Sequence, residues 1–361
     1  MISRFELGSG FKILMADSQS SRFLKVLSGT PSSPVPIWMM RQAGRHLPEY
    51  LELRSQAKDF LDFCYSPSMA AEATLQPIRR YDMDAAILFA DILLILDAIG
   101  LDVRFEKGVG PIVETVNGEA DLNRVPLEKA VQRLSPVYET VERVRSKLDD
   151  DKALIGFCGA PWTVALYAIE GRGGTDKSTA RSWAYTHPGL LEKLFDLLIE
   201  ASAQYLAEQV KAGADALMIF ESWAEGLPSD LFQTLVVEPN AKLVQRLRDM
   251  GINVPIVGFP RGAATMLGDY TSRVPVNGVG LDTAIDPAFV SQAVPKTMAV
   301  QGHLDPLLLI AGGDKMDARV RELLMAYSDR PHIFNLGHGV RPETPIKHVE
   351  RVVELVREGV R

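Results

Sequence analysis

The sequence predicts a single α/β domain, a closed (β/α)8 (TIM) barrel, and three observations favour this fold class. Short apolar, β-branched runs alternate with long amphipathic segments along the 361 residues, which is the pattern of strands and helices in turn. The strand-like runs show little alternation of apolar and polar residues, as expected where helices cover both faces of a parallel sheet. Eight such runs occur without an intervening linker, and eight strand–helix units close this barrel.

The expected strands are short and nearly free of charge. They are residues 37–40, 85–89, 153–157, 216–220, 255–259, 278–281, 298–301 and 333–335. An open, doubly wound sheet is the alternative, but the glycine-rich GxGxxG turn that such a sheet usually carries after its first strand is absent. Residues 101–117 interrupt the repeat with alternating polarity and several glycines, so we expect a small hairpin there.

Amphipathic segments supply the expected helices. They are residues 67–81, 126–148, 188–212, 229–250, 286–294, 314–327 and 345–358. Ser66 is a capping residue with Pro67 at the first helical position, and Gly213 is a typical stop after 188–212. These signals place the helix ends.

Composition limits the domain organisation and the partners. Residues 1–30 show no clear periodicity and are expected to be a poorly ordered extension, which leaves 31–361 as the barrel and catalytic domain. The net charge of −7 without a basic stripe argues against nucleic acid. The longest apolar stretch, 85–96, contains Asp91 and is too short to cross a bilayer. We expect a small-molecule substrate, with no nucleic-acid and no membrane partner.

Metal and cofactor signals are weak. Cys64 and Cys158 lie far apart and give neither a disulfide framework nor a zinc spacing. The six histidines do not form HExxH, and no phosphate-binding loop or pyridoxal-lysine context is present. The cysteine usage fits a reducing compartment, and the site is expected to act on an anionic substrate with side chains alone.

An arginine pair follows the first expected strand. Arg41 and Arg45 stand four residues apart, with Gly44 between them. A guanidinium can hold a carboxylate by two parallel hydrogen bonds, and glycine allows a backbone turn tight enough to aim both side chains into one pocket. In an acidic chain this pair indicates an anion-binding site. The alternative is an ordinary surface pair at a strand end.

Polar or ionisable groups follow every expected strand. Because the carboxyl ends of barrel strands meet at one face, we expect these groups to form the site. They are Arg41, Gln42, Arg45 and His46, then Asp91, Thr163, Tyr167, Glu221, Ser222, Arg261, Asp282, His303, Asp305 and His338. Asp282 and Asp305 could instead hold the barrel mouth together through salt bridges.

Several of these residues have a structural alternative. Asp91 lies between apolar neighbours, so its carboxylate needs a donor or a cation, but it could simply cap the next helix. Ser222 could also be a cap, since the GxSxG elbow of a hydrolase is absent, and Tyr167 could be a packing residue. His338 lies between two glycines that permit close backbone approach, which favours a site role. Residues 170–174 could form a lid or a plain flexible loop.

Five segments together resemble one known family. They are RQAGRHLPEY at 41–50, FADIL at 89–93, GAPWT at 159–163, FESWA at 220–224 and NLGHGVRPETP at 335–345. On these motifs the chain, from about residue 34 onward, is similar to the uroporphyrinogen decarboxylases. The resemblance implies a (β/α)8 barrel and a cytoplasmic homodimer that uses no metal or organic cofactor. It implies a carboxy-lyase that converts the four acetate arms of uroporphyrinogen III to methyl groups, giving coproporphyrinogen III in haem and tetrapyrrole biosynthesis.

The resemblance also assigns residues to roles. Asp91 matches the acidic residue expected to stabilise a protonated, cationic pyrrole, and Arg41 is the second catalytic residue. The implied substrate-binding residues are Arg41, Gln42, Ala43, Gly44, Arg45, Asp91, Tyr167, Ser222 and His338. Arginine is a weak acid, so the proton donor is left open, with a carboxylate-bound water or the substrate's own acid as options.

The chain departs from the family pattern at several positions, and two other functions compete. The departures are at His46, Ala90, Glu221, Ala224, Glu225 and His303. Of these, Glu225 puts an extra negative charge near an anion site. A corrinoid- or zinc-dependent methyltransferase would place His-x-Cys after a late strand, where this chain has no cysteine. A non-catalytic tetrapyrrole binder would keep the arginines but would not need Asp91.

Overall fold

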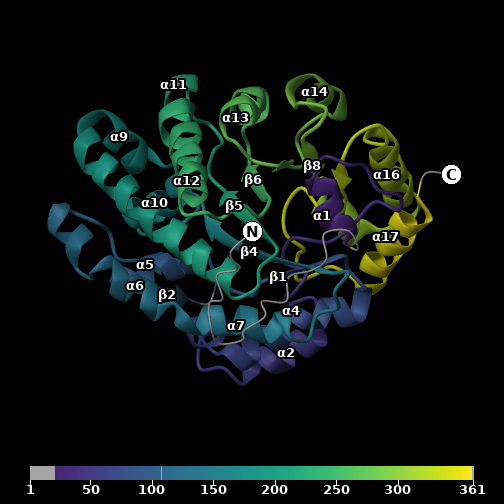
Figure 1. Cartoon of the computed structure of the whole chain (residues 1–361), viewed down its shortest axis with the longest axis horizontal. Coiled ribbons are helices and arrows are strands. Elements are labelled where there is room, and N and C mark those ends of the chain that lie inside the picture. Colours follow the sequence, from purple (N-terminus) through teal and green to yellow (C-terminus); the bar gives the residue numbers. More distant parts are fainter. Residues whose placement is uncertain (1–20, 107, 360–361) are drawn as a thin grey trace, which may run out of the picture.

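The computed structural model describes residues 21–106 and 108–359, and a curled parallel sheet lies at their centre (Figure 1). In that part of the chain the sheet has seven strands in the order β1-β4-β5-β6-β7-β8-β9. The strands are β1 (Ala85–Ile87), β4 (Ala153–Gly159), β5 (Ala216–Glu221), β6 (Ile256–Pro260), β7 (Gly278–Gly280), β8 (Ala299–Gln301) and β9 (His332–Ile333). Each neighbouring pair is parallel. The expected α/β class and parallel sheet are therefore present.

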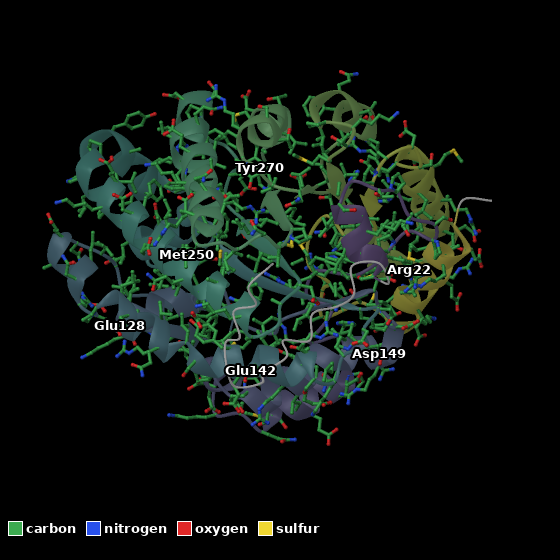
Figure 2. All side chains as sticks on the ribbon, viewed as in Figure 1. Arg22, Glu128, Glu142, Asp149, Met250 and Tyr270 are labelled. Atoms are coloured by element: carbon green, nitrogen blue, oxygen red, sulfur yellow. The ribbon has the colours of Figure 1, made fainter. Side chains whose placement is uncertain are left out.

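Helices cover the outer face of the sheet, and Figure 2 shows polar side-chain ends along their outer surfaces. The α-helices are α1 (Arg22–Leu27), α2 (Pro48–Ser55), α3 (Phe60–Cys64), α4 (Pro67–Tyr81), α5 (Leu94–Ala98), α6 (Leu127–Arg133), α7 (Ser135–Arg145), α8 (Pro161–Glu170), α9 (Ser178–Thr186), α10 (Pro188–Lys211), α11 (Ser229–Leu231), α12 (Glu238–Asp249), α13 (Leu267–Arg273), α14 (Pro287–Ala293), α15 (Pro306–Ala311), α16 (Gly313–Ala326) and α17 (Ile346–Glu358). Short 3-10 turns lie at Glu119–Asn123 and Ala264–Met266. Both faces of β4 are covered, and the strand is buried along its whole length.

The expected first strand, 37–40, does not form, and this corrects the prediction of eight strands. Ile37 makes only an isolated parallel bridge to Phe334. The Trp38 N–H donates to the Phe334 carbonyl at 3.3 Å, and the Asp84 N–H donates to the Ile37 carbonyl at 2.9 Å. The segment therefore lies between β9 and the start of β1, where an eighth strand would lie, without a regular ladder on either side.

Side-chain acceptors explain why this segment is irregular. The Ile37 N–H donates to the Asp84 carboxylate at 2.7 Å, and the Met39 N–H donates to Gln42 Oε1 at 3.0 Å. The Met40 N–H donates to Asn335 Oδ1, also at 3.0 Å. Three backbone donors that a strand would direct to neighbouring carbonyls are thus taken by side chains, which apolar patterning alone does not reveal.

Two expected helices are divided, and proline explains both divisions. Residues 126–148 form α6 and α7, with Pro136 in the first turn of α7. Residues 229–250 form α11, a π-helical stretch at Phe232–Val237 and then α12, which has Pro239 in its first turn. Proline lacks the N–H that would continue the hydrogen-bond ladder of a preceding helix. The expected excursion at 101–117 is confirmed as the antiparallel hairpin of β2 (Val103–Glu106) and β3 (Gly110–Val113).

The expected N-terminal extension, 1–30, falls mostly outside the described residues, since 1–20 are not described. For its last part the expectation of poor order is wrong. Residues 22–27 form helix α1, in which Phe23 and Leu27 are buried in the core. Helix α1 has only six residues, so its apolar residues at helical spacing were too few to predict a helix from the sequence.

Asp84 joins three distant parts of the chain at the start of β1. Its side chain is buried, with 3% of the residue exposed. It accepts the Ile37 N–H, pairs with Arg357 of α17 at 2.6 Å and pairs with Arg22 of α1 at 3.2 Å (Arg22 is labelled in Figure 2). A buried carboxylate is stable only with such partners, so Asp84 holds the two ends of the fold against β1.

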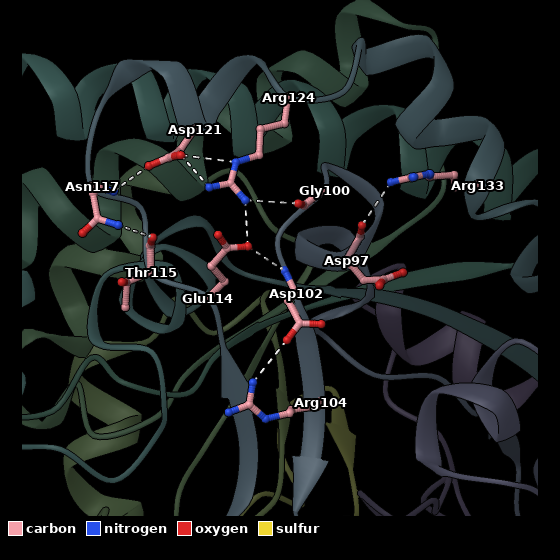
Figure 3. Close-up of polar contacts among 10 residues, drawn as sticks. All are labelled: Asp97, Gly100, Asp102, Arg104, Glu114, Thr115, Asn117, Asp121, Arg124 and Arg133. Carbon is pink, nitrogen blue, oxygen red and sulfur yellow. Dashed lines mark hydrogen bonds and ion pairs between the residues drawn. The ribbon is translucent and has the colours of Figure 1, made fainter.

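We expect Asp84→Asn to lower the free energy of unfolding by about 2 kcal/mol, because charge-assisted hydrogen bonds are lost from a buried site. The urea midpoint measured by circular dichroism tests this. The matched control is Asp102→Asn on the hairpin, where Asp102 pairs with Arg104 at 3.2 Å on the exposed surface shown in Figure 3. Surface pairs contribute little, so the control midpoint should stay within error, and equal shifts in both variants would contradict the role of Asp84.

Candidate active site at the carboxyl ends of the strands

A cavity of about 540 Å³ opens where the strands end. Its walls come from the turn after the 37–40 segment and from the loops that follow β5, β6, β7, β8 and β9. The charged and titratable lining residues are Arg41, Arg45, Arg261, Arg341, His338, Glu225, Asp282 and Asp305. Leu307, with 56% of its surface exposed, gives the cavity an apolar wall. Guanidiniums beside an apolar side chain suit a ligand that combines carboxylate groups with an apolar body.

Arg41 sits in a turn that its neighbours hold rigidly. Its φ of 60° lies in the left-handed region that a residue with a side chain rarely adopts. The Gln42 N–H closes the turn on the Met39 carbonyl at 3.0 Å. The Gln42 amide then donates to the Ala85 carbonyl at 3.0 Å, which fastens the turn to β1. This conformation directs Arg41 into the cavity.

Two glycines make room for this arginine. A Cβ at Gly339 would overlap the Cδ and Cγ of Arg41, so the guanidinium arm lies directly on the backbone of the last loop. A Cβ at Gly44 would lie 2.9 Å from the Arg41 carbonyl oxygen. Gly44 thus serves the tight turn through its small size, while the left-handed residue of the turn is Arg41 itself.

Asp91 lies close enough to Arg41 for their charges to interact. It is half-buried, and burial raises the pKa of its carboxyl group, while the Leu93 N–H and the charge of Arg41 act in the opposite direction. Its Oδ1 accepts the Leu93 N–H at 2.9 Å, just before α5. This bond closes a turn before α5 and is not a helix cap, because Leu93 is the N-cap of α5 and α5 has no side-chain cap hydrogen bond. The capping alternative is therefore not observed, and the bond fixes the orientation of the carboxylate.

Tyr167 on α8 belongs to the same electrostatic group. Burial raises the pKa of its hydroxyl; the charge of Asp91 raises it further and that of Arg41 lowers it. Its ring lies edge-on to Trp223, with 6.3 Å between centroids. A Cβ at Gly173 would lie 2.7 Å from the Tyr167 hydroxyl, so the loop after α8 covers it closely. Tyr167 is therefore both packed and placed beside charged groups.

His338 projects into the cavity between its two glycines. The ring is exposed to the cavity, but burial and the charges of Arg41, Arg261 and Arg341 together lower its pKa to about 4, while the charge of Glu225 acts in the opposite direction. The imidazole is therefore neutral at pH 7 and can donate or accept a hydrogen bond. The charge of Arg41 thus acts on His338, Asp91 and Tyr167.

Ser222 is positioned by a buried polar group behind it. Its N–H donates to Thr163 Oγ1 at 2.8 Å, and the Thr163 hydroxyl donates to the carboxyl group of Glu221. The Asn240 amide donates to the other Glu221 oxygen at 3.3 Å, and Tyr270, labelled in Figure 2, donates to Asn240 at 3.4 Å. Glu221 therefore joins β5 to α8 and α12 beneath the Ser222 loop.

Some expected site residues lie elsewhere. The side chain of Gln42 is buried and bonded to backbone on both sides, so the prediction that it contacts substrate directly is not supported by its position. His46 stacks on Tyr81 at 6.3 Å between centroids, and His303 is bonded to the Tyr327 hydroxyl at 2.9 Å. Ala43 and Gly44 can offer only backbone groups.

Asp282 and Asp305 hold the loops at the cavity by accepting backbone N–H groups. Among the described residues neither forms a salt bridge, which was the alternative that the sequence suggested. Asp282 accepts the Gly262 N–H at 2.7 Å and the Ala284 N–H at 2.9 Å. Asp305 caps α15 by accepting the Leu307 N–H at 2.8 Å. Sequence reasoning also missed Arg341, although its place three residues after His338 in an exposed loop was a usable signal.

Among residues 21–106 and 108–359, no group of three or more His, Cys, Asp or Glu side chains is arranged to hold a metal ion. Within the same residues, none of the helices combines the length and the apolar character needed to span a bilayer.

We expect the unfolding free energy to depend on pH through Glu221, because burial raises the pKa of its carboxyl group from the ordinary 4.5 to about 8. The unfolded chain releases this proton near 4.5, whereas the folded chain keeps it to about 8, so its stabilising contribution is full below 4.5 and is lost as the pH rises through 8. Relative to Glu221→Gln, the wild-type unfolding free energy should fall between pH 5 and 8, by at most about 1.4 kcal/mol per pH unit. Urea unfolding at several pH values measures this difference, and parallel curves would contradict it.

Sequence comparison with known proteins points to one family. The family described as Uroporphyrinogen decarboxylase (URO-D) matches residues 18–359. A uroporphyrinogen decarboxylase of Hyphomonas neptunium is 66% identical over 94% of this chain and 98% of its own length. One from Caulobacter vibrioides is 52% identical over 94% and 95%.

Solved structures agree in fold. A methyltransferase from Methanosarcina mazei superposes with a TM-score of 0.78 at 22% identity, covering 93% of this chain and 97% of that one. At this identity the likeness concerns the fold alone. The family match and the full-length relatives decide the assignment, and the chain belongs to the uroporphyrinogen decarboxylase family.

Proposed function

We propose that this protein catalyses the cofactor-independent decarboxylation of the four acetate side chains of uroporphyrinogen III, giving coproporphyrinogen III for haem and tetrapyrrole biosynthesis. Family membership names the reaction class. The single observation that carries the proposal is the placement of Arg41, which lines the cavity beside His338 and interacts with the charge of Asp91.

Substrate binding follows from the charge of the cavity. The substrate carries eight carboxylates, four acetates and four propionates, and guanidiniums bind carboxylates with two parallel hydrogen bonds. Arg41 and Arg45 are assigned to these arms, with the neutral His338 and the Ser222 hydroxyl as further hydrogen-bonding groups. Backbone N–H groups of Ala43 and Gly44 can add contacts, whereas Gln42 contributes by fixing the turn.

Catalysis needs a place for the electrons that carbon dioxide leaves behind. Protonation of the pyrrole ring at carbon gives an iminium-like cation, which accepts the electron pair when the acetate C–C bond breaks. A second proton then replaces the lost carbon dioxide on the side-chain carbon, and the ring carbon releases the first proton, which restores the aromatic pyrrole, so that one proton is consumed for each carbon dioxide released. Asp91 is assigned to stabilise the cation and to accept its N–H bonds, an effect of charges held ready before the reaction. Arginine is a poor acid, so Arg41 is assigned to holding the reacting carboxylate.

The same proposal includes the organisation of the chain. We infer one (β/α)8 catalytic domain over residues 31–361, with the segment at 37–40 taking the place of the eighth strand. Its support is the pair of backbone hydrogen bonds that connects this segment to Phe334 on one side and Asp84 on the other. The homodimer and the cytoplasmic location rest on the family resemblance.

An anaerobic assay with uroporphyrinogen III tests the function. Purified protein, without added metal or cofactor, should release carbon dioxide and yield a product that has lost four carboxylates. Zinc analysis of the same sample separates this reaction from methyl transfer. Tight binding of the porphyrinogen without any release of carbon dioxide would indicate a binding protein and would refute the proposal.

We expect Asp91→Asn to lower kcat by roughly 10²- to 10³-fold, the usual effect of removing one preorganised electrostatic group. Affinity for coproporphyrinogen III should change little, because the side chain keeps its shape and its bond to Leu93. Steady-state kinetics and product binding measure both. Asp102→Asn on the exposed hairpin is the matched control, and an Asp91→Asn variant with wild-type kcat would remove this role.

Arg41→Lys should lower kcat/KM roughly tenfold or more, because a lysine ammonium keeps the charge but loses the two-pronged contact. The left-handed turn is retained, so the effect reports on the side chain. Arg273→Lys, at the surface beside Gln233, is the control. If kcat/KM were equal in the two variants, Arg41 would not bind substrate through its fork.

A further inference from the structure

Arg261 is a cavity arginine that the family motifs do not assign. It follows β6 directly and lines the same cavity as Arg41 and His338. Its Nη1 donates to the Ser222 carbonyl at 3.0 Å and lies 3.4 Å from Glu225 Oε2. Both contacts use one nitrogen, so within the described residues Nη2 and Nε have no hydrogen-bond partner. The guanidinium therefore has an unused donor pair.

Glu225 is the carboxylate that faces this arginine. It also pairs with Lys177, whose Nζ lies 3.3 Å from Oε1 and donates to the Glu225 carbonyl at 3.1 Å. Glycine at 262 permits this approach, since a Cβ there would overlap the Cβ of Glu225. Lys177 itself lies over the Trp223 ring, 5.3 Å from its centroid. Packing and two cations thus fix Glu225 beside Arg261.

The contact between Glu225 and Arg261 is loose. Charge-assisted hydrogen bonds between a guanidinium and a carboxylate are about 2.7–2.9 Å long, and the strongest use two nitrogens. The 3.4 Å separation and the use of one nitrogen fall short of that geometry. The side chains of Arg261 and Glu225 are 30% and 41% exposed, so a stronger acceptor arriving through the cavity can compete for the guanidinium.

We propose that Arg261 is a further carboxylate-binding residue for the substrate and that Glu225 is its built-in competitor. This inference rests on the proposed function and extends it to how tightly the polyanion is held. A substrate carboxylate bonds to the unused Nη2 and Nε of Arg261, while Glu225 stays with Lys177. Glu225 thereby weakens binding of the acidic substrate and product, and Arg261 strengthens it.

Four proteins test the pair: wild type, Arg261→Gln, Glu225→Gln and the double variant. Each is assayed anaerobically for KM with uroporphyrinogen III and for the Kd of coproporphyrinogen III. Arg261→Gln should raise both constants roughly tenfold, the scale of one charged hydrogen-bonding group. Glu225→Gln should lower both about threefold. In the Arg261→Gln background the effect of Glu225→Gln should shrink by at least half, because the guanidinium for which Glu225 competes with the substrate is then absent.

The opposite signs separate this proposal from a purely structural role. If Lys177, Glu225 and Arg261 only fastened loops together, both single variants would weaken binding, and that result overturns the proposal. Additive effects in the double variant also overturn it, because Glu225 would then act on the whole cavity and not through Arg261. Arg273→Gln, which removes the same charge from α13, is the control and should leave both constants unchanged.

A variant that folds poorly does not block the test. Thermal unfolding compares each protein with wild type, and Arg261→Lys replaces Arg261→Gln if the latter is unstable. Lysine keeps the charge without the fork, so KM should rise about threefold, and an unchanged KM overturns the proposal. Absence of turnover in the wild type would refute the proposed function, whereas wild-type turnover with unaltered Arg261 variants would refute this inference alone.

Discussion

The site depends on one turn, in which Arg41 adopts a left-handed conformation at the end of an irregular segment. Nothing about arginine favours that conformation. It persists because the Gln42 side chain bonds to the Met39 N–H in front of the turn and to the Ala85 carbonyl on β1, and because Gly339 leaves room for the Arg41 side chain. Strain held by surrounding contacts is common where a side chain must point in one direction. Here the direction brings the Arg41 guanidinium into the cavity with His338, where its charge also acts on Asp91.

A buried carboxylate stabilises the fold at each end of the strands, Asp84 before β1 and Glu221 at the end of β5, and the two do so in different ways. At the start of β1, Asp84 forms ion pairs with two arginines and accepts a hydrogen bond from one backbone N–H. At the end of β5, Glu221 has Thr163 and Asn240 as partners, which are neutral, so burial favours its protonated form. Asp84 therefore joins α1 and α17 to β1 through ion pairs, whereas Glu221 is a mostly uncharged hydrogen-bonding group near the site.

Much of the fold could be predicted from apolar patterning, because the buried parallel strands at 153–157 and 216–220 are continuous runs. The failure at the first strand has a tertiary cause. Residues 37–40 look like a strand, but the side chains of Asp84, Gln42 and Asn335 take N–H groups of this segment. Asp84 and Asn335 are distant in sequence, so they leave no local signal. In the site, the position after each strand predicted Arg41 and His338, whereas the burial of Gln42 and the pairing of Glu225 depend on tertiary contacts.

The electrostatic character of the cavity depends on which of its acidic side chains are already bound to other groups of the protein. Asp282 and Asp305 direct their oxygens to backbone N–H groups, and Glu225 is shared between Lys177 and Arg261. These acids are therefore committed to holding loops or cations in place, while Arg41 and Arg45 face the cavity. A chain of net charge −7 can thus present a locally cationic surface, since the field in a cavity follows from which charges are paired there and not from the total.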